Sequence, residues 1–443
     1  MDRGWISTKS KPNKGRIYKM RIRNLRLALA LALIVGVISA CSSNNDNGKS
    51  SSGGKKTTLT ISRWAGPHAD DQKELLKQFE RETGITVKMD DVDYGQLQQK
   101  QMLNMSTKTG EYDLVWAQEI WIPEYIKAGY LHPIDDYVSN DALNPADFDF
   151  NDYNPNLINI LKNDGKLYGL PTFIQLPIMV YNNDMLAEEG LTAPKTWSET
   201  LAVAKHFHDK GTGIALPAKQ GQAAVDIFSS LVRSNNGNYF NADGKLDLTN
   251  PANVEAAAFW KDLSAESMNG SANWHFDEVN KAVQAGQAPI GFTISGLAGQ
   301  LEDKANSSVA GKIGYAPIPY GKQAFGTLSV WNWCVTADSK HPEEAYRLAA
   351  WLTSKSTEKQ MSLKDGQIAA RQSLFTDADL VKQFPFFPAV GESLKQADTQ
   401  PLTADAPKLM EALQTALSAI AVGNAEPKAA LEKAQQELAS VFK

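Results

Sequence analysis

Cysteine and histidine are scarce in this chain, and their scarcity narrows the chemistry that it can perform. The 443 residues include only two cysteines, Cys41 and Cys334, and six scattered histidines. Cys334 lies in an apolar run with no histidine nearby, a setting typical of a buried and unreactive thiol. His206 and His208 are two positions apart in a helical pattern, so their side chains diverge. The sequence therefore predicts neither a metal centre nor a cysteine nucleophile.

Several sequence motifs of common enzyme classes are also missing. There is no phosphate-binding loop and no Gly-x-Ser-x-Gly elbow, and Gly211-Thr212-Gly213 lacks the third glycine of a dinucleotide site. We therefore expect no cofactor. Acidic residues are plentiful, so a glycosidase carboxylate pair stays open on the sequence alone.

The chain also lacks an excess of positive charge outside its first residues. The whole sequence carries a net charge of −5, and residues 1–40 carry +8, so residues 41–443 carry −13. A surface this acidic repels phosphate backbones, and no basic stripe is visible. We expect no nucleic-acid partner.

A single long apolar run is present, and it lies near the N-terminus. Residues 27–40 are aliphatic apart from Gly36 and Ser39, and nine lysines and arginines precede them. Fourteen residues are too few to span a bilayer comfortably, but they fit the core of a signal peptide. Translation from Met20 would keep a sufficient basic region. We expect residues 1–40 to be a signal peptide.

The apolar run ends in Ile38-Ser39-Ala40-Cys41, which resembles a lipobox. That pattern implies that Cys41 receives a lipid and becomes the first residue of the mature chain, the only membrane attachment that we expect. An ordinary cysteine after a cleaved signal, or an uncleaved anchor, are the alternatives. Residues 42–56 contain no apolar side chain, so 41–57 is predicted to be the lipidated cysteine and a flexible tether.

From Thr57 onward, short β-rich runs alternate with longer amphipathic runs. Strands are predicted at 58–63, 85–89 and 112–116, with helices at 70–83 and 97–105 between them. This order implies parallel strands with right-handed crossovers, and ligands of such sheets lie beyond the carboxyl ends of the strands. The segments of interest are therefore 64–68 and 117–121.

Later segments continue the α/β pattern. Once Cys41 is modified, one cysteine remains, so no disulfide can form within the chain. Stability must then come from the size of the core, and the 403 residues of 41–443 suffice for two cores.

Two lobes are the simplest interpretation, because the α/β portions are too long for one sheet. The further predicted strands are 167–171, 178–182, 290–294, 314–319 and 328–335, and the further predicted helices are 197–208, 251–264, 276–285, 342–354, 409–420 and 431–441.

An ordered set of short motifs carries a family resemblance. The matching pieces are Phe79 to Ile85, Tyr112 to Trp116, Gly129 to Asp136, Gly165 to Pro171, Val180 to Asp184, Pro194 to Trp197 and Ala285 to Ala288. Together they resemble the family 1 extracellular solute-binding proteins of ABC importers, which include maltose- and polyol-binding proteins. The segment Trp331-Asn332-Trp333 is most similar to the polyol-binding branch.

The resemblance implies a fold and a function. The fold would be α/β and two-lobed, each lobe a mostly parallel sheet flanked by helices, with hinge crossings near 172–175, 325 and 367–371. Lobe 1 would comprise 58–172 plus 325–370, and lobe 2 would comprise 173–324 plus 371–443. The protein would be a monomer that binds a sugar or polyol by closing its lobes and delivers it to the permease subunits of an importer.

Candidate binding residues follow from strand ends and from the resemblance. Sugars need aromatic rings for their C–H faces and fixed polar groups for their hydroxyls. By the resemblance, Glu119 would grip hydroxyls, and Gln175 and Arg371 would contribute from the hinge crossings. The full predicted set is Trp64, Gln118, Glu119, Trp121, Gln175, Trp274, Ser295, Trp331, Asn332, Trp333 and Arg371. Asn332 alternates with its tryptophan neighbours, so either it or they face the cleft.

Two rival functions stay open at this point. One is a secreted lipoprotein glycosidase, which cleavage of candidate oligosaccharides would reveal. The other is a subunit that presents its ligand to a membrane sensor. Permease genes next to the gene of this protein would argue against that function.

Overall fold

A computed structural model describes residues 57–66, 68–403 and 405–442. The predicted signal peptide, Cys41 with its predicted lipid, and nearly all of the predicted tether lie outside these residues. Within the described part of the chain, every helix is too short or too polar to cross a membrane.

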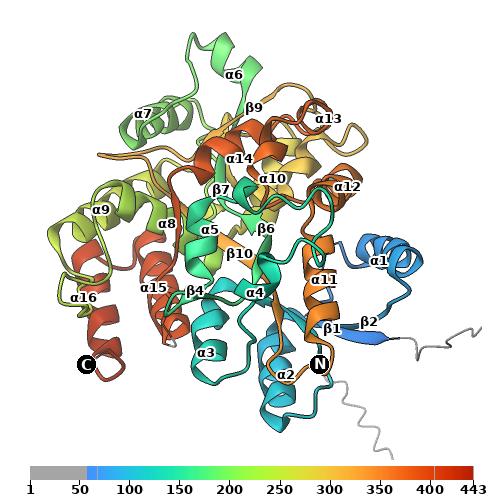
Figure 1. The fold of residues 1–443 in the computed structure, drawn as a ribbon. Helices are drawn as coiled ribbons and strands as arrows, with labels where there is room; N and C mark the ends of the chain where they lie inside the picture. Colours follow the sequence, from blue (N-terminus) through green and yellow to red (C-terminus); the bar gives the residue numbers. More distant parts are fainter. Residues whose placement is uncertain (1–56, 67, 404, 443) are drawn as a thin grey trace, which may run out of the picture. The chain divides into compact units, whose positions relative to one another are not determined.

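Strands and helices alternate in the first part of the described chain, and runs of successive strands and of successive helices follow (Figure 1). The strands are β1 Thr58–Trp64, β2 Thr86–Val92, β3 Leu114–Gln118, β4 Lys162–Asn163, β5 Lys166–Leu167, β6 Leu170–Gln175, β7 Pro177–Asn182, β8 Ile290–Ile294, β9 Ile313–Pro317, β10 Gly326–Val335 and β11 Ala397–Thr399. The helices are α1 Ala69–Thr83, α2 Tyr94–Thr107, α3 Ile122–Lys127, α4 Asp135–Val138, α5 Pro155–Ile160, α6 Asn183–Glu188, α7 Trp197–His208, α8 Gln222–Ser234, α9 Pro251–Ala265, α10 Phe276–Gln284, α11 Pro342–Leu352, α12 Lys355–Asp365, α13 Ala378–Gln383, α14 Phe387–Leu394, α15 Ala406–Ala421 and α16 Pro427–Leu438. Short 3₁₀ helices are η1 Glu119–Trp121, η2 Phe150–Asp152, η3 Ser271–Asn273, η4 Ser295–Glu302 and η5 Gln372–Thr376.

The first sheet has the topology that the sequence predicts for its first three strands. β1 lies between β2 and β3 and is parallel to both. The crossover helix α1 ends at Gly84, whose φ of 76° is a left-handed conformation that glycine adopts without strain. β10 then returns antiparallel to β3 and to β6, so β6 runs in the same direction as β3.

The second sheet differs from the predicted pattern of strand direction. β7 pairs antiparallel with both β8 and β9, whereas a mostly parallel sheet was expected there. The reason is that β7 follows β6 after a single residue, Leu176, and enters this second sheet rather than returning through a crossover helix. Among the described residues, the parallel pairing of β8 is limited to an isolated bridge between Ala215 and Gly291.

Two hydrophobic cores are present among the described residues. The first is built around Leu59, Ile61 and Leu114 of the first sheet, and residues 368–397 also contribute to it. The second is built mainly from α7, α8, α9, α15 and α16. In Figure 1 the red C-terminal helices α15 and α16 lie beside the green α8 and α9, in agreement with their packing.

Helix α8 is absent from the elements predicted by sequence. Its thirteen residues are buried at ten positions, so apolar and small side chains occupy nearly the whole circumference. Its three remaining residues, Gln222, Asp226 and Arg233, are polar and lie on one narrow side, so the helix is amphipathic even though no helix was predicted at 222–234. Because α8 packs against β10, its position matters for the candidate site.

Candidate ligand-binding site

Three predicted binding residues end three strands at one edge of the first sheet. Trp64 is the last residue of β1, Gln118 ends β3 and Gln175 ends β6. These strands run in one direction, so their carboxyl ends meet at the same edge. β10 lies between β3 and β6, and Ser329 pairs with Gln175 across the ladder while its hydroxyl accepts from Gln118 Nε2 at 2.9 Å.

Aromatic rings from four segments form a cluster at this edge, which we call the aromatic cluster. Trp331 is its centre: its ring lies 4.5 Å from Trp116, 5.5 Å from Trp121 and 5.7 Å from Trp64. Trp64 stacks on it at an interplanar angle of 14°, and Tyr94 meets Trp64 edge-on at 5.9 Å. The predicted pair Trp331 and Trp333 does point to one side of β10, since both rings contact Trp116.

Exposure differs sharply within the aromatic cluster. Trp331 and Trp333 are buried, with 2 % and 1 % of their surface exposed, and Trp121 is buried as well. Trp64 is partly buried, while Tyr94 is 47 % exposed. The face that a solute can reach in this conformation is therefore formed by Tyr94 and the edge of Trp64, over a buried floor of tryptophans.

Polar groups line up beside Tyr94. Its hydroxyl donates to Gln118 Oε1 at 2.8 Å, and burial of that hydroxyl raises the pKa of Tyr94 to about 12. Glu119 is buried, and its Oε2 accepts from the Val330 amide at 2.7 Å and from the Ser329 hydroxyl at 3.3 Å. Glu119 thus fixes the start of β10 against η1.

A second carboxyl group, Asp226 of α8, belongs to the same neighbourhood. Its charge raises the pKa of both Tyr94 and Glu119, after the larger effect of burial. Burial raises the pKa of Glu119 to about 8 and that of Asp226 to about 7. Asp226 Oδ1 accepts from Gln222 Nε2 at 2.7 Å, and the Asp226 carbonyl accepts from the Thr327 hydroxyl at 3.0 Å. The site therefore brings together a helix of the second core and strands of the first.

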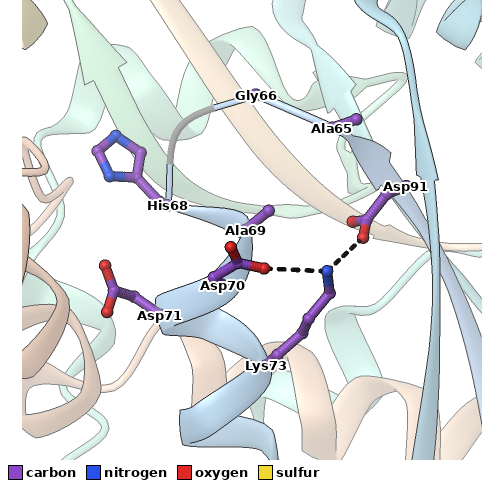
Figure 2. A pocket seen from close by; sticks show the side chains of 8 residues that line it. All are labelled: Ala65, Gly66, His68, Ala69, Asp70, Asp71, Lys73 and Asp91. Atoms are coloured by element: carbon purple, nitrogen blue, oxygen red, sulfur yellow. Dashed lines mark hydrogen bonds and ion pairs between the residues drawn. The ribbon is translucent and has the colours of Figure 1, made fainter.

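A cavity of about 390 Å³ is lined mostly by the residues that follow Trp64 in the sequence. Figure 2 shows its lining side chains from close by. Lys73 points toward Asp91, with Nζ 2.9 Å from Asp91 Oδ2 and 3.2 Å from Asp70 Oδ1, while His68 points to the opposite side. Asp71 pairs with Lys364 of α12 at 3.1 Å. These charged side chains are paired with one another, so the hydrogen-bonding groups offered to an uncharged solute lie in the aromatic cluster. The lining residues are Ala65, Gly66, His68, Ala69, Asp70, Asp71, Lys73 and Asp91.

Three further predicted residues, Asn332, Ser295 and Trp274, make no ring contact or hydrogen bond with the aromatic cluster's side chains among the described residues. Asn332 is fully buried on the other side of β10, where its Nδ2 donates to the carbonyls of Val330 and Ala117. Ser295 is also fully buried, and its hydroxyl accepts from the Leu176 amide at 3.2 Å. Trp274 packs partly buried against the first core, without a ring contact to the cluster among the described aromatic residues.

Arg371 occupies a place that differs from the expected one. The resemblance implies a forked donor for ligand hydroxyls, but Arg371 is fully buried in the structure. Its guanidinium lies 3.9 Å from the centre of the Tyr153 ring, and its Nε donates to the Thr353 carbonyl at 2.7 Å. A buried cation needs such partners. The Nη2 of Arg371 has no hydrogen-bond partner among the described residues, but the side chain has no exposed surface for a solute in this conformation. We therefore leave Arg371 out of the proposed binding set.

Three residues of the site were missed by sequence reasoning: Tyr94, Ser329 and Asp226. Tyr94 comes two residues after β2, so the strand-end rule applied to β2 would have found it. Ser329 lies two positions before Trp331 on β10, so the alternation of side chains along a strand places it on the same side as Trp331. Asp226 lies on α8, and the amphipathic pattern of that helix, with Gln222, Asp226 and Arg233 on its polar side, could have indicated it. Among the described residues, no group of three His, Cys, Asp or Glu side chains could hold a metal ion.

Comparison with known proteins gives a consistent result. A family model described as bacterial extracellular solute-binding protein matches residues 65–359. A probable amino-acid ABC transporter periplasmic-binding protein of Sinorhizobium fredii is 29 % identical over 352 residues, which cover 77 % of each chain.

Two solved structures of solute-binding proteins are also similar. One, from Agrobacterium radiobacter in complex with ribitol, is 28 % identical with a TM-score of 0.74, and the match covers 87 % of this chain and 99 % of that one. The other, from Agrobacterium vitis with bound D-mannitol, is 25 % identical with a TM-score of 0.71, covering 87 % and 98 %. Their two-lobed α/β fold confirms the predicted fold class. The chain belongs to the bacterial extracellular solute-binding proteins, the substrate-binding components of ABC transporters.

Proposed function

We propose that this protein captures a sugar or polyol outside the cytoplasmic membrane and delivers it unchanged to the permease subunits of an ABC importer. The observation that supports this most directly is the aromatic cluster with Gln118, Ser329 and Glu119 at its edge. Rings suit the C–H faces of a sugar, and fixed amide, hydroxyl and carboxyl groups suit its hydroxyls. The ribitol and mannitol bound by two similar proteins point to the same class of ligand.

The same geometry argues against the rival glycosidase function. A glycosidase needs two carboxyl groups that reach opposite sides of a glycosidic bond. Glu119 is 2 % exposed, and its Oε2 is already bonded to Val330 and Ser329. We propose that Glu119 orders β10 and polarises the site, and that no covalent chemistry takes place.

We propose that solute capture closes the two lobes about strands that link them. Phe173 and Ala369 form an isolated bridge, as do Tyr153 and Arg371, so the first and third predicted crossings lie side by side. Glu358 contacts the third crossing, where its Oε2 accepts from the Ala370 amide at 3.1 Å. The proposed lobe boundaries fall at these crossings, except that the packing of residues 368–397 in the first core favours a return to lobe 2 after 397.

We propose that Cys41 anchors the protein to the outer face of the membrane through a lipid. This rests on the lipobox-like sequence before Cys41 and on the polar stretch 42–56 behind it. A Cys41→Ala variant expressed in its host is expected to accumulate as uncleaved precursor and to incorporate no labelled fatty acid. A variant that still carries label would contradict the anchor.

Thermal melts with added solutes test the proposed function. A ligand at a hundred times its dissociation constant stabilises a protein by roughly 2.7 kcal/mol, which is a clear rise in melting temperature. We expect ribitol, D-mannitol or a related sugar to give that rise and to be recovered chemically unchanged. A panel of sugars and polyols without any effect, or recovery of cleaved ligand, would contradict the proposal.

A further inference from the structure

The aromatic cluster offers a solute very little exposed ring surface. Among the described residues, the exposed large aromatic side chains are Tyr94, at 47 %, and Tyr320, at 39 %. Tyr320 lies apart from the cluster, where its backbone pairs with Thr196 next to α7. Tyr94 is therefore the one exposed aromatic side chain of the cluster within the described chain.

Trp64 is covered on its ring surface as well as partly buried. Trp331 stacks on it at 5.7 Å, and the backbone of Gly66 lies so close that a Cβ there would come within 2.2 Å of the indole. Only glycine fits at position 66 while Trp64 keeps this orientation. Trp64 thus contributes an edge rather than a free face.

Ring surface limits the length of a carbohydrate ligand. Each unit of an oligosaccharide that is held by stacking needs its own exposed ring, because the apolar C–H patch of a sugar covers about one aromatic face. One exposed ring, flanked directly by Gln118 and by buried tryptophans, provides for one unit. The floor below it is closed, since Trp121 and Trp331 are buried.

Charge around the site limits the chemistry of the ligand. The charged groups that shift the pKa values of Tyr94 and Glu119 are acidic, and Asp226 acts on both. The cations nearby are engaged: Arg63 is buried over the Trp116 ring at 4.8 Å and donates to Gln72 and to the Trp64 carbonyl, and Lys73 pairs with Asp70 and Asp91. A ligand carboxylate would therefore meet like charge, and these neighbouring cations of the described chain already have acidic or backbone partners.

We infer that the site takes a single uncharged unit, an alditol or a monosaccharide, and that Asp226 of α8 accepts from its hydroxyls and excludes solutes that carry a carboxylate. This inference rests on the proposed function and narrows it. It excludes oligosaccharides, sugar acids and amino acids as ligands. Amino acids are excluded even though one relative is named for amino-acid transport. Asp226 is suited to the role because α8 packs against β10, whose residue Ser329 adjoins Gln118.

Titration calorimetry of the full-length protein at pH 8 tests the inference with matched solutes. The pairs are ribitol with ribonate, D-mannitol with mannonate and D-glucose with glucuronate, and maltotetraose represents longer chains. At least one uncharged single unit is expected to bind, with its acid and maltotetraose at least a hundredfold weaker. The inference is overturned if maltotetraose or one of the acids binds as tightly as any uncharged unit. The proposed function would still stand after that result. If neither the single units nor maltotetraose bind, the proposed function fails with it.

The Asp226→Asn variant tests the assigned residue. We expect this variant to bind the uncharged unit about tenfold more weakly, because a carboxylate acceptor is replaced by an amide. We also expect the ratio of its affinities for the uncharged unit and for the corresponding acid to fall at least tenfold. Asp243→Asn is the matched control: it removes the same charge from an exposed turn, and both quantities should stay as in the wild type. Thermal melts verify that both variants fold. An unchanged preference in a folded Asp226→Asn protein contradicts the role of Asp226.

Discussion

At the scale of single residues, Glu119 shows how burial changes what a carboxyl group contributes. Its oxygen orders β10 through the Val330 amide and the Ser329 hydroxyl, yet removal from water favours the protonated form and raises its pKa from 4.5 to about 8. Burial raises the pKa of Asp226 in the same way, from 3.8 to about 7. Both groups therefore hold a proton more firmly in the folded than in the unfolded chain.

That difference predicts a pH dependence of stability. A group whose folded pKa lies above its unfolded value contributes stability that is fully present below the unfolded pKa and is lost as the pH rises through the folded one. For Glu119 this window runs from 4.5 to about 8. A Glu119→Gln variant cannot ionise, so the wild type should lose stability relative to this variant between pH 5 and pH 9. Melting temperatures of both proteins across this range provide the measurement.

Asp243→Asn again serves as the control, because it removes an exposed carboxylate and should give a constant offset from the wild type. The account of Glu119 fails if the difference between wild type and Glu119→Gln is as flat with pH as that of the control.

At the scale of elements, strand β10 shows what the sequence could and could not predict. The period of two in Trp331-Asn332-Trp333 placed the tryptophans on one side and Asn332 on the other, as the ring contacts with Trp116 and the bonds of Asn332 confirm. Strand direction likewise placed Trp64 and Gln118 at one edge. What the period cannot predict is exposure, because Trp64, at the end of a strand more than 260 positions away, stacks on the Trp331 ring.

Arg371 and Asp226 were missed or misplaced for a related reason. The surroundings of Arg371 are made by Tyr153, Phe148 and Thr353, which only the folded chain brings together. Asp226 lies on the narrow polar side of α8, a helix that was not predicted, and its hydrogen-bond partner Thr327 on β10 is 101 positions away in sequence. Local patterns predicted most of the strands and the longer helices other than α8 and α12, but not the short helices. Side-chain partners distant in sequence decided the burial of the candidate residues.

At the scale of the whole molecule, two hydrophobic cores and a site built from both support a closing mechanism. Gln118, Ser329 and Tyr94 belong to elements of the first sheet and its helices, while Asp226 belongs to α8 of the second core. A solute held by both sets of groups stabilises the arrangement in which they face each other, which is how a binding protein couples capture to a change of shape.

Small-angle X-ray scattering with and without a saturating single-unit solute tests this central claim most directly. The solute is the one that calorimetry identifies among ribitol, D-mannitol and their relatives, and the Asp226→Asn variant at the same solute concentration provides the comparison. The account predicts a smaller radius of gyration for the wild type on addition of solute, and a weaker or absent change for the variant. A wild-type radius of gyration that stays constant while calorimetry shows full occupancy would contradict capture by closure of the two lobes.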